Sequence, residues 1–325
     1  MGNVSSVLSV HHLYKPMAIP ENFLPSSVIA NKLLTPLLLT AGLTALTYAG
    51  ICYALYSYQR KLIFRPLPDL LKTPAEIGLA YEDIWIPVSS KQEPATPPAE
   101  NETQLHAWWL PNPGTERVML FCHGNYGNIS YNLERIRFHH ALGFSVLAFD
   151  YRGYGLSSKS EAFPSEQSTY ADIEAAWTYL VNERQISPAQ ITVCGHSMGG
   201  AIAIDLATRH PDIANLIVKS SFTTMEDAVE AKRIYRAFPV KQMLAHPFDS
   251  LSKVKELKVP VLYVHGDQDF DVPTEFSKRL YAATPSRKQI WIATGADHNN
   301  ISTVQGETYA AVVKDFCADK QLQSA

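Results

Sequence analysis

The chain alternates short apolar runs with longer stretches in which apolar residues recur at helical spacing. Apolar positions repeated every three or four residues predict amphipathic helices at about Ser130–Leu142 and Ser168–Arg184. Short runs rich in β-branched and apolar residues, bounded by turn-forming residues, predict strands. We expect them at Gly78–Val88, Leu105–Leu110, Arg117–Cys122, Ile191–Val193, Pro260–Val264 and Gln289–Ile292. Strands that alternate with helices in this way are typical of an α/β domain.

A long uncharged run precedes this pattern. No charged residue lies between Lys32 and Arg60, so Leu33–Tyr58 is an apolar stretch of 26 residues. As a helix it would be about 39 Å long, enough to cross a hydrocarbon core of about 30 Å. We place Pro36 in its first turn. Its second half carries tyrosines, as an interfacial aromatic belt does: Tyr48, Tyr53, Tyr56 and Tyr58.

Two other interpretations of this run fit less well than a single membrane anchor. Signal peptides have apolar cores of about 7–15 residues that lie nearer the start of the chain, and no clear small-x-small cleavage site follows this run. A buried core helix that is apolar on all sides over this length is rare in soluble domains. We therefore expect a membrane-spanning helix.

The charges that flank the run favour one orientation. Arg60, Lys61 and Arg65 follow it, whereas only Lys15 and Lys32 precede it, which favours a C-terminal domain on the cytoplasmic side. The four cysteines, at positions 52, 122, 194 and 317, have no paired spacing and also favour a reducing compartment. The first six residues match a myristoylation pattern at Gly2.

Composition restricts the domain organisation and the partners. The 325 residues are 46% hydrophobic and carry a formal net charge of −3. No basic patch or low-complexity tract indicates nucleic-acid binding. We expect an N-terminal tail at 1–32, a transmembrane anchor at 33–59 and one α/β domain at 60–325.

The most informative motif follows the predicted strand at Ile191–Val193. It reads Gly195-His196-Ser197-Met198-Gly199-Gly200 and leads directly into the apolar helical stretch Ala201–Ala207. A Gly-x-Ser-x-Gly motif between a strand and a helix is the nucleophile elbow, a tight turn that exposes the serine hydroxyl at the top of a sheet. Any side chain at either glycine would collide with the neighbouring strand or helix. The motif predicts that Ser197 is a nucleophile.

A serine nucleophile needs a base and an acid, which follow it in that fold in the order Ser, acid, His. Three carboxylates follow the strand Pro260–Val264, and we place the acid at Asp269. Asp267 is the alternative, and Asp271 is expected to cap the next helix. A calcium loop is excluded because it would need a glycine at Val272 and a glutamate at Lys278.

The base is His298, the only histidine after the acid, in the loop past the strand Gln289–Ile292. The oxyanion hole needs two backbone N–H groups. One is assigned to Met198 and the other to Asn125 or, as the alternative, Tyr126, in the loop after the strand that ends at Cys122. His123 is expected to make structural hydrogen bonds beneath that loop.

At this point the chain resembles the α/β-hydrolase fold family and, within it, the membrane-anchored, Bem-like branch of abhydrolase-domain proteins. The matching segments are Tyr58–Pro66, His123-Gly124-Asn125-x-Gly127-Asn128, Asp150–Gly155, Gly195–Gly200, Phe248-Asp249-Ser250, the acid loop and Asp297-His298-Asn299. The resemblance implies a mostly parallel sheet of about eight strands flanked by helices, a short helical lid at about 222–259, and a serine hydrolase with the triad Ser197, Asp269 and His298.

Two departures from related hydrolases limit the function that can be assigned. The oxyanion loop lacks the glycine run of many lipases, and Tyr126 replaces the branch's usual small residue, which narrows the expected entrance. The candidate pocket residues are Tyr126, Phe222, Met225 and Phe238, with further lid side chains available at Tyr235, Met243 and Phe248. Asp150 and Arg152 are expected to form a structural ion pair.

These residues predict hydrolysis of a carboxylic ester or thioester, or of an amide, through an acyl-enzyme, with no metal or organic cofactor. An anchor beside the site favours acyl-lipid or acylated-protein substrates. The alternatives are a non-catalytic membrane scaffold of the same fold and a serine peptidase. A dehalogenase of this fold would need an aspartate where Ser197 stands.

Overall fold

The computed structural model describes residues 26–88, 103–158 and 164–318. The chain divides into two compact units, Met1–Tyr53 and Ala54–Ala325. The myristoylation pattern at Gly2 lies outside the described residues. Helix α1 (Ser26–Ile63) contributes to both units, and its last two to three turns, from Ala54 onward, belong to the second unit.

Helix α1 begins earlier than the apolar run predicts. Pro36 therefore lies inside the helix and not in its first turn, so that expectation is wrong. Proline has no N–H, and within the helix it removes one backbone hydrogen bond. The segment Leu34–Ile63 is long and apolar enough to cross a membrane, and none of its most apolar window is buried.

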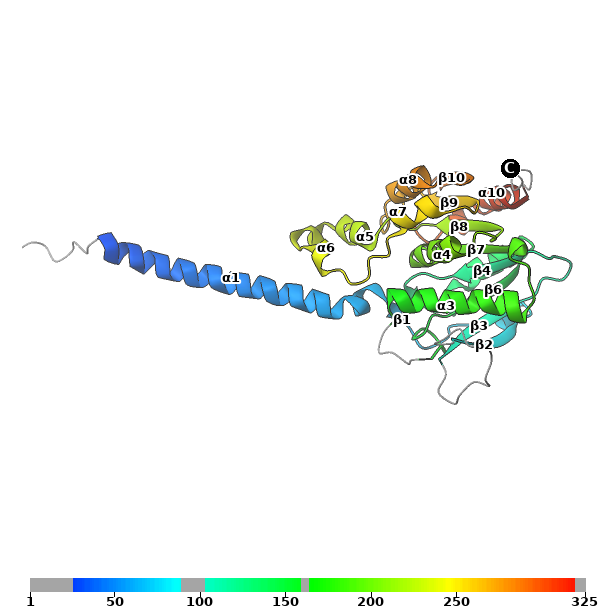
Figure 1. Cartoon of the computed structure of the whole chain (residues 1–325), viewed down its shortest axis with the longest axis horizontal. Helices are drawn as coiled ribbons and strands as arrows, with labels where there is room; N and C mark the ends of the chain where they lie inside the picture. The colour runs from blue at the N-terminus through cyan, green and yellow to red at the C-terminus, as the bar shows by residue number, and fades with distance from the viewer. Residues whose placement is uncertain (1–25, 89–102, 159–163, 319–325) are drawn as a thin grey trace, which may run out of the picture. The chain divides into compact units, whose positions relative to one another are not determined.

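The second unit is built on a mixed sheet of eight strands (Figure 1). Its order is β2-β3-β6-β4-β7-β8-β9-β10, and all neighbours pair in parallel except β2 with β3 and β3 with β6. The strands are β2 (Glu82–Pro87), β3 (Gln104–Leu110), β4 (Val118–Cys122), β6 (Ser145–Phe149), β7 (Ile191–His196), β8 (Asn215–Lys219), β9 (Val261–Gly266) and β10 (Lys288–Ala293). The expected mostly parallel α/β fold is confirmed.

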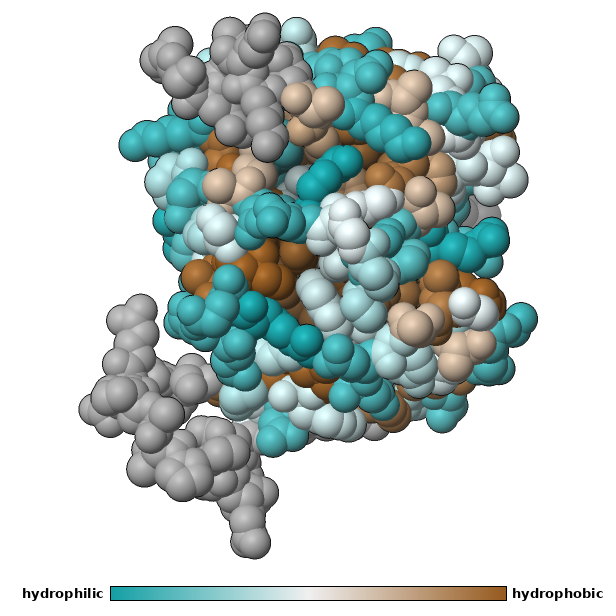
Figure 2. All heavy atoms as spheres, turned by 90° about the vertical axis from the view of Figure 1, so that its right-hand side faces the viewer, coloured by the Kyte–Doolittle hydropathy of each residue, from teal (hydrophilic) through white to brown (hydrophobic). Residues whose placement is uncertain are grey.

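Helices cover both faces of the sheet and bury a core on each. One core includes side chains of α3 (Glu166–Thr178), α4 (Met198–Arg209), α7 (Ser250–Lys253) and α8 (Thr274–Ala283). The other includes side chains of α2 (Leu133–Ala141), α9 (Ile301–Val304) and α10 (Gly306–Ala318). Both faces of strands β4, β6, β7 and β8 are therefore buried, which explains why these strands read as continuous apolar runs. On the face that Figure 2 shows, hydrophilic residues predominate and hydrophobic ones form separate patches.

Two predicted elements have different bounds in the structure. The strand expected at Gly78–Val88 begins only at Glu82, because a short 3-10 helix (Pro74–Ile77) ends at Gly78 with a left-handed φ of 77°. The helix expected at Ser168–Arg184 begins at Glu166, where the hydroxyl of Ser165 caps it. Its last turn, Tyr179–Glu183, is a π-helix.

The lid segment lies between β8 and β9. It contains α5 (Met225–Ala231), a 3-10 helix (Arg233–Ala237) and α6 (Val240–Met243). A small two-stranded sheet, β1 (Arg65–Pro66) with β5 (Tyr126–Gly127), joins the end of α1 to the loop after β4. Through the lid and this small sheet, the end of α1, the loop after β4 and the segment between β8 and β9 all contribute to one cavity.

Candidate active site

Ser197 occupies the tight turn between β7 and α4. Its backbone has φ 56° and ψ −121°, a left-handed conformation that costs about 1–3 kcal/mol in a residue with a side chain. The turn is held by two hydrogen bonds: the Ser197 N–H donates to the Lys219 carbonyl (2.9 Å), and the Ser221 hydroxyl donates to the Ser197 carbonyl (2.8 Å).

Both flanking glycines are required by close backbone approach. A Cβ atom at Gly195 would collide with the backbone of Gly199, and one at Gly199 would collide with the carbonyl of Cys122 on the neighbouring strand. The turn therefore has the geometry of a nucleophile elbow, as the motif predicts.

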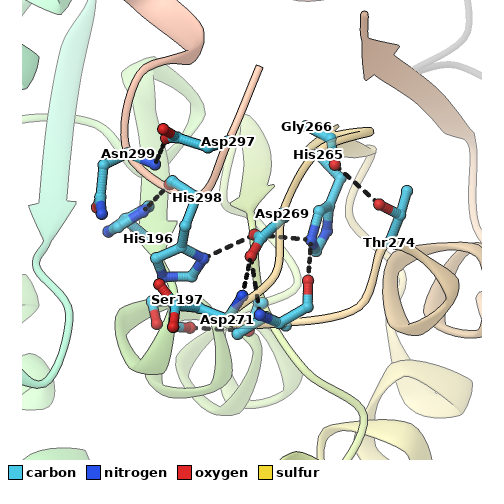
Figure 3. Close-up of polar contacts among 12 residues, drawn as sticks. His196, Ser197, His265, Gly266, Asp269, Asp271, Thr274, Asp297, His298 and Asn299 are labelled. Atoms are coloured by element: carbon cyan, nitrogen blue, oxygen red, sulfur yellow. Dashed lines mark hydrogen bonds and ion pairs between the residues drawn. The ribbon is translucent and has the colours of Figure 1, made fainter. Parts of the chain in front are cut away.

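Asp269 and His298 meet at the ends of β9 and β10 (Figure 3). The distance between His298 Nδ1 and Asp269 Oδ2 is 2.7 Å. The other carboxylate oxygen, Oδ1, accepts hydrogen bonds from the N–H groups of Asp271 (2.9 Å) and Val272 (2.8 Å). Burial would raise the pKa of Asp269, but hydrogen bonds from His265 and His298 outweigh it and hold the pKa well below its ordinary value. The carboxylate is therefore ionised beside the imidazole.

The two other aspartates of this loop face elsewhere. Asp267 is exposed and accepts a hydrogen bond from the Gly295 N–H at 2.7 Å. Asp271 was expected to cap the following helix, and this is wrong: α8 starts after Pro273 without a side-chain cap, and Asp271 lies 3.3 Å from the Lys232 ammonium. The N-cap position is taken by Pro273, and the carboxylate of Asp271 turns instead to a lysine that is distant in sequence.

Sequence reasoning missed two histidines that hold the Asp269–His298 pair. His265 Nε2 lies 3.1 Å from Asp269 Oδ2, and its Nδ1 lies 2.7 Å from the Ser277 hydroxyl. The ring of His196 is buried, and its Nε2 donates to the backbone carbonyl of His298 at 3.0 Å. Burial and then the charge of Arg135 lower the pKa of His196 well below its ordinary value, so this ring is neutral. The only signal in the sequence is that each of these histidines follows a predicted strand within three residues.

The loop that carries His298 is fixed by its neighbours. Asp297 Oδ1 accepts hydrogen bonds from the N–H groups of Asn299 (2.7 Å) and Asn300 (2.9 Å). From α2, the guanidinium of Arg135 donates to Asn299 Oδ1 at 2.8 Å. Arg135 is a third residue of the site that the sequence did not indicate.

Asn125 and Met198, whose backbone N–H groups are expected to form an oxyanion hole, line the same cavity as Ser197. The loop of Asn125 is held by its side chain, which donates to the Ile63 carbonyl (2.9 Å), and by its carbonyl, which accepts from the Tyr154 hydroxyl (2.9 Å). Within the part of the chain that the structure describes, the N–H groups of Asn125 and Met198 donate to no other acceptor. Each is therefore available to a ligand.

The buried polar residues beneath this loop pair differently from the expectation. Arg152 forms an ion pair with Asp172 at 2.6 Å, so the expected Asp150–Arg152 pair is wrong. The carboxylate of Asp150 instead turns under the loop, where Oδ1 accepts from the Ile129 N–H (2.8 Å) and lies 3.3 Å from His123 Nε2. His123 is buried, with Nδ1 2.7 Å from the Gly124 carbonyl, so its contacts lie within and beneath the loop.

A cavity of about 820 Å³ opens over Ser197 and His298. All four candidate pocket residues, Tyr126, Phe222, Met225 and Phe238, line it, as do Tyr235 and Met243. Phe248 does not line the cavity: it is completely buried and packs on Phe64 and Phe222, with ring centroids 6.1 and 6.4 Å away. The end of α1 supplies a wall that the sequence reading did not include, with Leu55, Gln59 and Leu62.

A sheet of this strand order, with a serine at the elbow after β7 and a histidine–aspartate pair at the ends of β9 and β10, defines the class of the α/β hydrolases. A family model described as serine aminopeptidase, S33, matches residues 114–252. The chain is 32% identical to the alpha/beta hydrolase domain-containing protein WAV2 of Arabidopsis thaliana, over 76% of this chain and 82% of WAV2. The chain belongs to the Bem-like family of α/β hydrolases.

Two further relatives and one solved structure are similar along most of their length. Protein bem46 of Schizosaccharomyces pombe is 28% identical, over 83% of this chain and 89% of bem46. The uncharacterized membrane protein YNL320W of Saccharomyces cerevisiae is 27% identical, over 86% and 95%. The Pyrococcus furiosus esterase Pf2001 has a TM-score of 0.62 at 23% identity, over 79% of this chain and 97% of the esterase, which shows the shared fold.

Proposed function

We propose that this hydrolase cleaves carboxylic esters or thioesters through an acyl-enzyme on Ser197. The observation that carries the proposal is the 2.7 Å contact between His298 and Asp269 at the cavity in which Ser197 stands on a strained turn. A strained turn costs free energy, and such turns are retained where the exposed side chain has a function.

In the first half of the reaction His298 takes the proton of the Ser197 hydroxyl as its oxygen attacks the acyl carbon. The bond from that carbon to the leaving oxygen or sulfur then breaks, and His298 gives its proton to the leaving group. In the second half His298 activates a water, which releases the carboxylic acid and restores Ser197. Asp269 holds the tautomer of His298 and stabilises the imidazolium that forms.

The developing negative charge on the acyl oxygen needs two donors. The N–H groups of Met198 and Asn125 are both at the cavity and donate to no other acceptor among the described residues. Removal of one such donor typically costs a factor of about 100–1000 in turnover. This pair supports acyl transfer in preference to a scaffold role, which would need neither donor.

Labelling with a fluorophosphonate probe tests the nucleophile. We expect the full chain in detergent to be labelled, and labelling to be lost in Ser197→Ala but kept in Ser252→Ala, which changes an exposed serine of α7. Folded protein that shows no labelling would support the scaffold alternative. Turnover of aminoacyl amides in preference to esters would support the peptidase alternative instead.

We also propose that α1 anchors the enzyme in a membrane with its catalytic unit on the cytoplasmic side. The proposal is supported by the exposed apolar surface of Leu34–Ile63, by the flanking charges and by a relative whose name calls it a membrane protein. The protein should stay in the pellet after carbonate extraction at high pH. In sealed vesicles with the cytoplasmic side outward, added protease should digest the catalytic unit. Survival of that unit would reverse the orientation.

A further inference from the structure

The side chains that line the cavity carry more positive than negative charge. Its lining includes three cationic side chains, Arg65, Arg135 and Lys232, but only one carboxylate, Asp271. The Lys232 ammonium lies 3.3 Å from Asp271 and accounts for that carboxylate. Over residues 26–88, 103–158 and 164–318, neither Arg65 nor Arg135 forms an ion pair. Two guanidinium groups thus line the catalytic cavity without a carboxylate in ion-pair contact among the described residues, although the charge of Asp297 also acts on Arg135.

Arg135 is the more informative of the two because it is half-buried. Its guanidinium donates to two neutral amide oxygens, Asn132 Oδ1 (3.0 Å) and Asn299 Oδ1 (2.8 Å), while its buried Nε has no partner among the described residues. Burial of a cation without a carboxylate in direct contact costs free energy, part of which an anionic ligand would recover.

Arg65 lies next to the other side of the catalytic machinery. Its guanidinium stands 5.1 Å from the ring centre of Tyr126, and its backbone N–H donates to the carbonyl of Asn125 at 2.9 Å. Arg65 thus contacts Tyr126, the residue after the proposed oxyanion donor Asn125. Arg135 contacts Asn299, the residue after the proposed base His298.

The remaining lining is largely apolar. It consists of side chains from the last turns of α1 and from the lid, among them Leu55, Leu62, Met225, Val229, Phe238 and Val240. Such a wall suits a hydrocarbon chain. These side chains have no positive charge and no hydrogen-bond donor with which to bind an anion.

We propose that the substrate is an amphiphile whose acyl chain contacts the apolar wall and whose leaving alcohol or thiol carries a phosphate, bound by Arg135 and Arg65. This inference rests on the proposed Ser197 chemistry. In that chemistry the acyl part stays on Ser197 while the carbon–oxygen or carbon–sulfur bond breaks and His298 protonates the leaving atom. Because the acyl chain occupies the apolar wall, the anion belongs to the part that leaves.

The test compares substrates that differ by the phosphate. In mixed micelles of a neutral detergent, kcat/KM is measured for 1-oleoyl lysophosphatidate and for 1-oleoyl glycerol, which share both the acyl chain and the ester. Oleoyl-coenzyme A and S-oleoyl N-acetylcysteamine form the corresponding thioester pair. We expect a preference of about tenfold or more for the phosphate-bearing member in one pair, which identifies a lipid or a thiol as its source.

Variants of the arginines distinguish binding of the phosphate from positioning of the loop that carries His298. Arg135→Gln should remove most of that preference, and Arg65→Gln, an exposed position that leaves the fold intact, should reduce it severalfold. The matched control is Arg137→Gln, also on α2, whose exposed side chain pairs with Glu134 outside the cavity; it should keep the preference. If Arg135 only positions Asn299 and His298, its loss will slow both members of a pair equally and leave the ratio unchanged.

Two results would overturn the inference: no preference for the phosphate-bearing member in either pair, or a preference that both arginine variants retain. Neither result concerns Ser197. Failure of the proposed function would appear instead as absence of fluorophosphonate labelling and of turnover with all four substrates.

Discussion

The side-chain amide of Gln59, near the end of α1, bonds in both directions to the lid segment. Its oxygen accepts from the Ala245 N–H at 2.7 Å, and its nitrogen lies 3.2 Å from the Met243 carbonyl. Gln59 is the first residue after the apolar run Leu33–Tyr58, and it lines the catalytic cavity. The helix proposed to anchor the enzyme therefore also fastens one side of its lid.

Gln59→Leu should loosen this attachment. The two lost hydrogen bonds are each worth about 1 kcal/mol, so the lid should open about 30-fold more often. Limited trypsin digestion measures this opening as faster cleavage after Lys241, an exposed residue of α6. Gln242→Leu, an exposed neighbour, is the control and should be cleaved like the wild type. Equal cleavage of all three proteins would show that Gln59 does not restrain the lid.

The proposed role of Asp269 as the acid of a catalytic triad can be tested with a matched pair of aspartates in one loop. Asp269→Asn should lower kcat by a factor of about 10⁴, because an amide favours the wrong tautomer of His298. Asp267→Asn changes an exposed carboxylate that bonds to Gly295 and should leave kcat close to the wild-type value. A large loss in Asp267→Asn with little effect of Asp269→Asn would contradict the assignment.

Lys219 predicts an unusual dependence of stability on pH. Its side chain is only 3% exposed, and burial, followed by the charge of Arg135, lowers its pKa to about 7. In the unfolded chain the pKa is about 10.4, so the unfolded state binds more protons between these values. The cost of burying the charge is thus complete below about pH 7 and disappears as the pH rises toward about 10.

Lys219→Met should consequently raise Tm at about pH 6.5 by about 4 °C, and this gain should shrink at about pH 9.5. Thermal unfolding of the full chain in detergent at both values measures it. Lys258→Met, at an exposed lysine before β9, should change Tm little at either pH. An equal increase in Tm at both pH values would mean that removal of the buried charge does not cause the increase.

Chain-length selectivity should depend on α5. Ala228 lines the cavity, so Ala228→Trp would fill part of the apolar wall with an indole. Turnover of a palmitoyl ester should fall about tenfold or more relative to a butyryl ester. Glu230→Trp, on the same helix but outside the cavity lining, is the control. Equal losses for both esters in Ala228→Trp would indicate that the acyl chain lies elsewhere.

Much of the architecture could be predicted because its strands, helices and nucleophile elbow depend on residues that are close together in the sequence. The elbow at Ser197 needs glycine at 195 and 199 for reasons of backbone contact, and the strand before it and the helix after it follow the hydrophobic pattern. The order Ser, Asp, His reduced the candidates for the base to His298 alone. Element bounds were less accurate where a cap or a left-handed residue decided them, as at Ser165 and Gly78.

The wrong expectations about side-chain contacts concern residues whose partners lie elsewhere in the sequence. Asp271 pairs with Lys232 of the lid, and Arg152 pairs with Asp172 of α3, so no local pattern could assign either. Phe248 resembles the other lid aromatics in sequence, but the packing of Phe64 and Phe222 takes it into the core.

The sequence by itself determined the α/β class, the elbow that presents Ser197 and the apolar run that ends at Tyr58, because each depends on neighbours within one strand, turn or helix. Only the tertiary structure decided that His265 and His196 hold the Asp269–His298 pair, that Gln59 joins α1 to the lid, and that Arg65 and Arg135 line the same cavity. Those relationships depend on which strand ends and loops the sheet brings together. Because these segments are far apart in the sequence, the local pattern of residues does not predict their contacts.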